Sequence, residues 1–139
     1  MFEIRYVSEG DKQFWFSLDN HMSESEFALK VRDRRGYIIS DAGKPAGIMR
    51  YNLFLDNTPY LTLIHLEQPH HGKGFGRQAV LFWEREMREL GYKMVMTSTN
   101  VDEQAQHFYR KLGYIDRGGL FLDNTPIAQP QELLMLKVL

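Results

Sequence analysis

The stretch His71-Gly72-Lys73-Gly74-Phe75-Gly76-Arg77 joins an expected strand over residues 60–66 to an expected helix over residues 76–90, and it carries three glycines. Glycines let a backbone approach a ligand closely because no Cβ stands in the way. The first turn of the following helix leaves N–H groups unpaired, and the helix dipole makes that end positive. The stretch therefore predicts a cradle for an anion such as a diphosphate, to which Lys73 or Arg77 would add a positive charge.

The spacing Gly-x-Gly-x-Gly separates this stretch from two other phosphate-binding loops. A P-loop has four residues between its glycines and then Gly-Lys-Ser/Thr, and this chain has no such pattern. The dinucleotide fingerprint needs Gly-x-Gly-x-x-Gly early in a βαβ unit, and that is also absent. A tight turn that binds nothing is the alternative interpretation of the three glycines.

Hydrophobic periodicity on both sides of the loop predicts elements in the order β-α-α-β-β-β-α-β-α-β-β. The expected strands cover residues 2–8, 36–40, 47–55, 60–66, 93–98, 120–122 and 133–138, and the expected helices cover residues 11–18, 23–35, 76–90 and 101–112. Strands mixed with helices around an antiparallel meander predict an α/β (α+β) fold, with helices on both faces of a mixed sheet. No linker divides the chain, so we expect a single domain over residues 1–139.

Particular residues mark the ends and faces of these helices. Asp11 is a candidate N-cap for the first helix, and Ser23 opens a capping box at the start of the second. Gly36 is expected to end the second helix, because glycine adopts the left-handed conformation common at helix C-termini. On the third helix, Glu84 lies four residues before Arg88, which predicts an ion pair on its flank.

Composition excludes several classes of protein. The chain has no cysteine, which excludes disulfides and thiolate metal sites. No His-x-x-x-His pattern supports another metal site. A net charge of −1, with neither half polarised, argues against nucleic acid or a membrane as the main partner. The N-terminus has no features of a signal peptide and no apolar run is long enough to span a membrane, so we expect a cytoplasmic protein.

Two motifs in this chain resemble those of the GNAT superfamily, the Gcn5-related N-acetyltransferases. The family's acetyl-CoA loop runs Arg/Gln-x-x-Gly-x-Gly/Ala, and here it stands as His71-Gly72-Lys73-Gly74-Phe75-Gly76. A second family motif, A-x-x-F/L-Y-x-K-x-G-F/Y, stands as Ala105-Gln106-His107-Phe108-Tyr109-Arg110-Lys111-Leu112-Gly113-Tyr114. The order of the elements also matches, so the resemblance covers essentially the whole chain. It implies a GNAT-like, mostly antiparallel central sheet and transfer of acetyl from acetyl-CoA to an amine.

The resemblance also implies which residues contact coenzyme A. They are Leu66, His71, Gly72, Lys73, Gly74, Phe75, Gly76, Arg77, Asn100 and Tyr109. His71 replaces the family's Arg or Gln, a position from which only the backbone N–H need face phosphate. Asp102 stands where many members have Asn, and Asn100 is the alternative for that contact. Acetyl-CoA is the cosubstrate in this family, and no metal is implied.

For catalysis, the resemblance implies that the Leu66 N–H polarises the thioester carbonyl and that Tyr109 is the general acid. Tyr109 lies about 100° around the helix from Phe108, which continues an apolar stripe that begins at Val101. We therefore expect Tyr109 on the flank of the buried face, and a packed tyrosine with a solvated hydroxyl is the alternative. Glu67 is the candidate general base, with His65 or ordered water as alternatives.

The acceptor amine is not identified by the sequence. In the resembling family, the first two helices and their loop set specificity, and here that loop is residues 19–26. Acidic groups there, beside aromatic surface from Trp15, Phe16 and Tyr51, would suit a cationic amine. A capped, solvated helix start is the alternative. We expect a small-molecule or peptide amine as partner, and a homodimer is one arrangement that the resemblance allows.

Two further functions stay open at this point. A GNAT-shaped domain can hold acyl-CoA as a sensor without catalysis, although the presence of Tyr109 argues against that role. The glycine loop is also compatible with a nucleotide-binding protein of unusual spacing.

Overall fold

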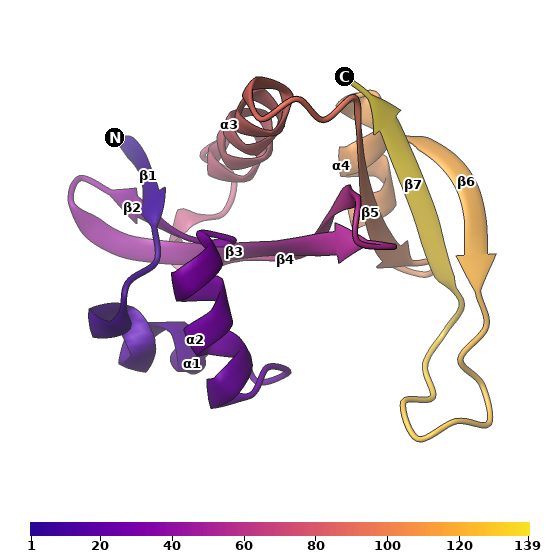
Figure 1. Ribbon diagram of the computed structural model, residues 1–139, viewed down its shortest axis with the longest axis horizontal. Coiled ribbons are helices and arrows are strands. Elements are labelled where there is room, and N and C mark those ends of the chain that lie inside the picture. Colours follow the sequence, from indigo (N-terminus) through magenta and orange to yellow (C-terminus); the bar gives the residue numbers. More distant parts are fainter. The chain divides into compact units, whose positions relative to one another are not determined.

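The computed structural model describes all of residues 1–139, and it confirms the predicted order of elements (Figure 1). The strands are β1 (Phe2–Tyr6), β2 (Gly36–Asp41), β3 (Lys44–Phe54), β4 (Thr58–Leu66), β5 (Met94–Asn100), β6 (Ile115–Leu120) and β7 (Glu132–Val138). The helices are α1 (Lys12–Leu18), α2 (Glu24–Asp33), α3 (Phe75–Glu89) and α4 (Ala105–Lys111), with short 3₁₀ turns η1 (Glu9–Asp11) and η2 (Gln68–His70).

Hydrogen bonds link the strands into one sheet in the order β1-β2-β3-β4-β5-β7-β6. The β4–β5 pair is parallel, whereas β1–β2, β2–β3, β5–β7 and β6–β7 are antiparallel. The expectation of a mixed, mostly antiparallel sheet is therefore confirmed. Contacts divide the chain into two compact units, residues 1–52 with 62–83 and residues 53–61 with 84–139. The expectation of a single domain over residues 1–139 stays a prediction.

In the first unit, β2 and β3 form the expected hairpin. The turn between them consists of two residues, Ala42 and Gly43, whose φ angles are 52° and 82°. Positive φ at both central positions is the geometry that matches the twist of paired strands. Asp41 is the last residue of β2, so the hairpin fixes its position next to the turn.

The core of the first unit forms where α1 and α2 pack against the strands. Buried residues from these elements make one cluster: Val7, Trp15, Phe27, Ile38 and Ile48. The rings of Trp15 and Phe27 meet edge to face with centroids 5.7 Å apart. The apolar positions that the sequence placed on α1 and α2 therefore hold these two helices against each other and the sheet.

The predicted end of α2 is wrong, and Asp11 occupies the N-cap position of α1 without a capping hydrogen bond. The α2 helix ends at Arg34, which adopts the left-handed conformation itself with φ of 56°. Gly36 instead begins β2, where a Cβ would lie 2.8 Å from Val7 Cγ1, so close packing requires glycine there. The Asp11 side chain does not cap α1, because it accepts hydrogen bonds from Arg5 and from the backbone N–H of Ser8.

The Ser23 cap is confirmed, since Ser23 Oγ accepts the backbone N–H of Glu26 at 3.2 Å. The helix that follows therefore starts where the sequence predicts, at Glu24. This cap fixes the C-terminal end of the loop between α1 and α2.

In the second unit, β7 lies between β5 and β6 (Figure 1). The sixth strand covers Ile115–Leu120, so the prediction of residues 120–122 was wrong. All six of its residues are exposed and its register shifts between Asp116 and Gly118. An exposed edge strand needs no apolar alternation, which removes the signal that predicts strands.

Gly47 in β3 packs closely against the end of β4. A Cβ on Gly47 would lie 2.6 Å from both His65 O and Leu66 Cδ2. The absence of a side chain therefore sets the position of the end of β4, the strand that leads into the glycine loop.

We expect Gly47→Ala to lower the free energy of unfolding by about 1–3 kcal/mol, because the added methyl overpacks the contact with β4. Chemical denaturation measures the change. Gly10→Ala is a matched control, since its new Cβ would lie 3.9 Å from Ser8 Oγ. Equal stability of the two variants would contradict the close approach at Gly47.

Candidate functional site

The glycine loop connects the end of β4 to the start of α3. Gly72 and Gly74 both have φ of 78°, a conformation that other residues adopt only with strain. A Cβ at either position would meet nothing within 4 Å, so the space outside the loop is open. The glycines are therefore required by backbone conformation, and they leave the backbone accessible to a ligand.

The first turn of α3 follows directly on these glycines. Gln78 N–H donates to Gly74 O at 3.0 Å, which is the first helical bond. The N–H groups of Phe75, Gly76 and Arg77 precede it and have no carbonyl of the helix to meet. Three amides at the positive end of a 15-residue helix thus have no helical partner, which is the arrangement that the predicted anion cradle requires.

Two side chains of the loop are engaged within the chain. Lys73 Nζ lies 3.2 Å from Asp41 Oδ2, so its charge is already paired. Phe75 is only 6% exposed, packs edge to face on Phe2 and stacks on His70. Phe75 therefore anchors the loop in the core, and its backbone is the part open to a ligand. Arg77 is exposed in the first turn of α3.

His71 ties the loop back to the end of β4. Its Nε2–H donates to Leu66 O at 2.7 Å. The backbone N–H of His71 donates to Gln68 O at 3.1 Å. That amide is therefore engaged within the chain, contrary to the expectation that it faces phosphate.

The candidates for polarising group and base gather at the end of β4. Leu66 is the last residue of the strand and is half-buried against Gly47. Glu67 lies just beyond the strand, where its N–H donates to Ala46 O at 2.9 Å. His65 is exposed and Glu67 is half-buried. The structure thus places all three within one short segment of the first unit.

In the second unit, Tyr109 is the buried residue of α4, with 5% of its surface exposed. The prediction that placed it on the flank of the buried face was wrong, because Phe108 is only half-buried and Val101 is exposed and outside the helix. Helix α4 is shorter than expected, so the apolar stripe does not begin at Val101.

The environment of Tyr109 keeps its phenol protonated. Burial raises the pKa of Tyr109 to about 12, and its hydroxyl is hydrogen-bonded to Thr97. Thr97 Oγ1 donates its one hydrogen to Leu61 O at 3.1 Å, so toward Tyr109 it accepts. Tyr109 is therefore protonated at neutral pH, as an ordinary tyrosine also is.

Sequence reasoning missed a buried polar cluster beside Tyr109. Glu84 is 2% exposed, accepts the Tyr114 hydroxyl at 2.8 Å and pairs with Lys137 at 2.7 Å. The predicted pair with Arg88 is therefore wrong. Burial and the Glu84 carboxylate raise the pKa of Tyr114, whose ring meets that of Tyr109 with centroids 5.3 Å apart. Tyr114, the last residue of the second motif, was the one sequence signal that could have pointed to this cluster.

Asn100 and Asp102 differ in the structure. Asn100 Nδ2 donates to Glu103 at 2.7 Å, whereas its Oδ1 is buried without a hydrogen-bond partner. Asp102 is exposed in the following turn. Because a buried acceptor without a partner is unfavourable, Asn100 is the better candidate for a ligand contact.

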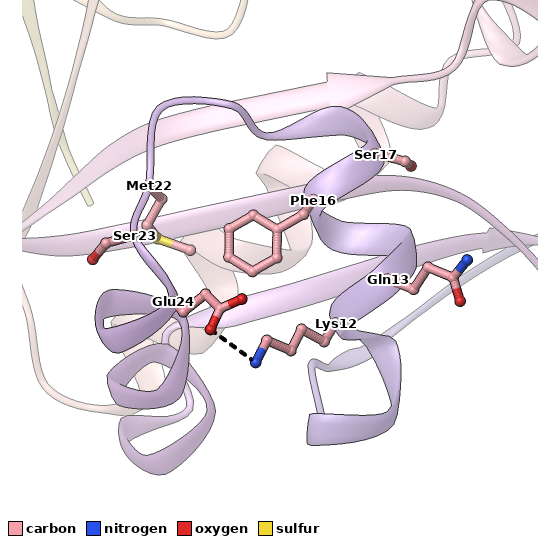
Figure 2. Close-up of a pocket in the computed structure, with 7 residues that line it drawn as sticks. All are labelled: Lys12, Gln13, Phe16, Ser17, Met22, Ser23 and Glu24. Atoms are coloured by element: carbon pink, nitrogen blue, oxygen red, sulfur yellow. Dashed lines mark ion pairs between the residues drawn. The ribbon is translucent and has the colours of Figure 1, made fainter.

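The loop between α1 and α2 borders a shallow hollow (Figure 2). It is lined by Lys12, Gln13, Phe16, Ser17, Met22, Ser23 and Glu24. Phe16 and Met22 supply its apolar surface, and Lys12 Nζ pairs with Glu24 at 3.3 Å across it. Of the three predicted aromatic residues, Phe16 alone lines the hollow, because Trp15 and Tyr51 are buried in the core.

Asp19, the first acidic residue of that loop, is engaged within the chain. It is 1% exposed, accepts Trp15 Nε1–H at 3.1 Å and pairs with Arg50 at 2.9 Å. Asp19 therefore anchors the loop, and it is not available to a cationic acceptor.

No three or more His, Cys, Asp or Glu side chains gather in a way that could hold a metal ion. No helix combines the length and the apolar character needed to cross a membrane.

The family model for the acetyltransferase (GNAT) family matches residues 3–114, which include the glycine loop and the α4 motif. This chain belongs to the GNAT acetyltransferase family. No curated protein matches its sequence.

Solved structures similar to this GNAT chain cover nearly its whole length. The ribosomal-protein-S18-alanine N-acetyltransferase of Escherichia coli has TM-score 0.80 and 18% identity, over 99% of this chain and 94% of its own. The spermidine/spermine N-acetyltransferase SpeG of Vibrio cholerae has TM-score 0.80 and 18% identity, over 99% and 92%. An acetyltransferase of Bacillus subtilis in complex with CoA has TM-score 0.78 and 18% identity, over 100% and 99%. At these identities the likeness shows the fold.

We expect Tyr109 to ionise only as the pH nears 12, against 10.0 for an ordinary tyrosine. Since the folded state keeps this proton where the unfolded chain has lost it, the associated stability is present below pH 10 and is lost as the pH rises toward 12. Titration of tyrosinate absorbance in the wild type and in Tyr109→Phe isolates the residue. If Tyr109→Phe removed a transition near pH 10 that the wild type shows, Tyr109 would have an ordinary pKa and the expected shift would be wrong.

Proposed function

We propose that this protein is an N-acetyltransferase that moves acetyl from acetyl-CoA to the primary amine of a small molecule or a peptide. The observation that carries the proposal is the glycine loop, where two left-handed glycines and the first amides of α3 form an open anion cradle. The family assignment indicates which anion the cradle holds, because GNAT members are acetyltransferases.

Binding of acetyl-CoA is assigned to backbone groups in the first unit. The amides from Gly72 to Arg77 would bind the diphosphate, and the exposed Arg77 side chain would add a charge contact. Lys73 contributes less, because its ammonium is paired with Asp41. Asn100 Oδ1, a buried acceptor without a partner, is assigned to a donor group of the same substrate.

The reaction joins the amine nitrogen to the acetyl carbon and breaks the bond from that carbon to sulfur. The attacking amine must be neutral, so one proton leaves it, and the sulfur takes up a proton as it departs. We assign the Leu66 N–H to the carbonyl oxygen and Tyr109 to protonation of sulfur. The resemblance supports both roles.

Removal of the proton from the amine is assigned to Glu67, directly or through water. Glu67 is half-buried at the end of β4, beside Leu66, whereas His65 in the same segment is exposed. A base is most useful where it is oriented, and the Glu67 backbone is held by Ala46. Ordered water or His65 is the remaining source of a base if Glu67 has no role.

The hollow beside the α1–α2 loop is the proposed place of acceptor recognition. Its apolar surface comes from Phe16 and Met22, and its acid, Glu24, is exposed and shared with Lys12. Structures of similar fold include an enzyme for a ribosomal protein alanine and one for spermidine and spermine. Amines of both kinds therefore belong in the assay. We also propose that the protein forms a homodimer and is located in the cytoplasm.

Release of free CoA from acetyl-CoA, measured with polyamines, aminoglycosides and peptide N-termini, tests the activity. We expect at least one amine to be acetylated. Tight binding of acetyl-CoA without turnover on any amine would instead identify a sensor, and a thermal shift with ATP or NAD alone would identify a nucleotide-binding protein.

We expect Tyr109→Phe to lower kcat by about tenfold or more with little change in the KM for acetyl-CoA, because it removes the proton donor and keeps the ring. Tyr6→Phe is the matched control, since Tyr6 is 40% exposed on β1, and its kcat should equal that of the wild type. A Tyr109→Phe variant with wild-type kcat would remove Tyr109 from the mechanism.

A further inference from the structure

We propose that Asp41 is a positioning residue that holds the glycine loop in the shape that binds the diphosphate. The inference rests on the proposed function and adds to it a residue outside both family motifs. Asp41 ends β2, 30 positions before the loop begins, and no sequence pattern points to it.

One carboxylate oxygen of Asp41 holds two residues that bracket the first glycine. Asp41 Oδ2 lies 3.2 Å from His70 Nδ1 and 3.2 Å from Lys73 Nζ. The other oxygen, Oδ1, lies 2.7 Å from the amino nitrogen of Met1. The Met1 amino group and the Lys73 ammonium lower the pKa of Asp41 to about 2, so the group is a carboxylate at ordinary pH.

The contacts of His70 extend this support to the far side of the loop. The His70 ring stacks on Phe75 with centroids 6.4 Å apart and an interplanar angle of 15°. Phe75 packs in turn on Phe2, with centroids 5.6 Å apart. Asp41 thus fixes His70 and Lys73 directly, and through the His70 ring it supports the residue at which α3 begins.

The two glycines of the loop supply no side-chain support of their own. Gly72 and Gly74 have no side chains, and nothing lies within 4 Å of where their Cβ atoms would be. A loop rich in glycine loses much conformational entropy when it becomes ordered. Support that orders the loop in advance reduces the free energy that binding must supply for ordering.

The negative charge of Asp41 opposes diphosphate binding, whereas its positioning of the loop favours it. The carboxylate neutralises Lys73 and repels a nearby diphosphate, so its removal would free a cation for the ligand. Lys73 is 50% exposed, so its pair with Asp41 contributes little in either direction, whereas the side chains of the His70–Asp41 contact are only 19% and 16% exposed. We therefore expect the loss of positioning to exceed the gain in charge.

The test compares coenzyme A with pantetheine, which lacks the diphosphate and the nucleotide, by titration calorimetry. Asp41→Ala should raise the Kd for coenzyme A by about fivefold or more and leave the Kd for pantetheine nearly unchanged, because the loop must then be ordered by binding. Asp33→Ala is the matched control, since Asp33 pairs with Arg32 on α2, and neither Kd should change.

His70→Ala tests the same role without altering the charge of the hairpin. It should raise the Kd for coenzyme A as Asp41→Ala does. The Kd of the double variant should not exceed the higher of the two single-variant values, because the two residues act through one contact. Additive losses would overturn the proposal. So would an unchanged or tighter Kd for coenzyme A in Asp41→Ala, or an equal loss for both ligands. A wild type that binds neither ligand would remove the proposed function as well.

Discussion

The left-handed backbone at Gly72 and Gly74 is the constraint on which the candidate site depends. The chain must turn from the end of β4 into the first turn of α3 within a few residues, and both glycines have φ of 78° to do so. Any other residue type would introduce strain at these positions. The same geometry leaves the amides of the helix start without partners within the helix, which makes this turn suitable for an anion. The supports from Asp41, His71 and Phe75 matter because the glycines themselves supply none.

Each unit of the chain contains one buried carboxylate with the same kinds of partner. Asp19 in the first unit is joined to Arg50 and the Trp15 indole, and Glu84 in the second is joined to Lys137 and the Tyr114 hydroxyl. A buried charge is tolerated only when a cation and further donors satisfy it. In each case the cluster fixes a segment next to a proposed functional group, the α1–α2 loop for Asp19 and the ring beside Tyr109 for Glu84. These charges therefore organise the site and are not available to substrate.

Much of this architecture was predictable, and the failures share physical causes. Periodicity predicted every helix and strand whose one face is buried, and Ser23 gave the start of α2. Strand β6 was misplaced because both faces are exposed, so its sequence carries no alternation. Glu84 was placed in a surface pair because spacing along a helix does not reveal Lys137, which lies 53 residues later. The glycine loop was predictable because its requirements are local, whereas the role of Asp41 depends on a contact between distant segments.

Recognition of the acceptor differs in kind from recognition of acetyl-CoA. In the proposed site, backbone amides would bind the diphosphate, and their position follows from glycines that leave a motif in the sequence. The hollow at α1 and α2 is formed by side chains, and its opposite charges, Lys12 and Glu24, already pair. Their side chains are 41% and 76% exposed, so the pair contributes little to stability. In the proposed mode of recognition, an acceptor ammonium would replace Lys12 at Glu24 with little loss of stability, and contact with Phe16 and Met22 would select the carbon chain that follows the amine. Specificity at this hollow would depend on apolar fit more than on net charge, which is why charge patterning in the sequence does not reveal it.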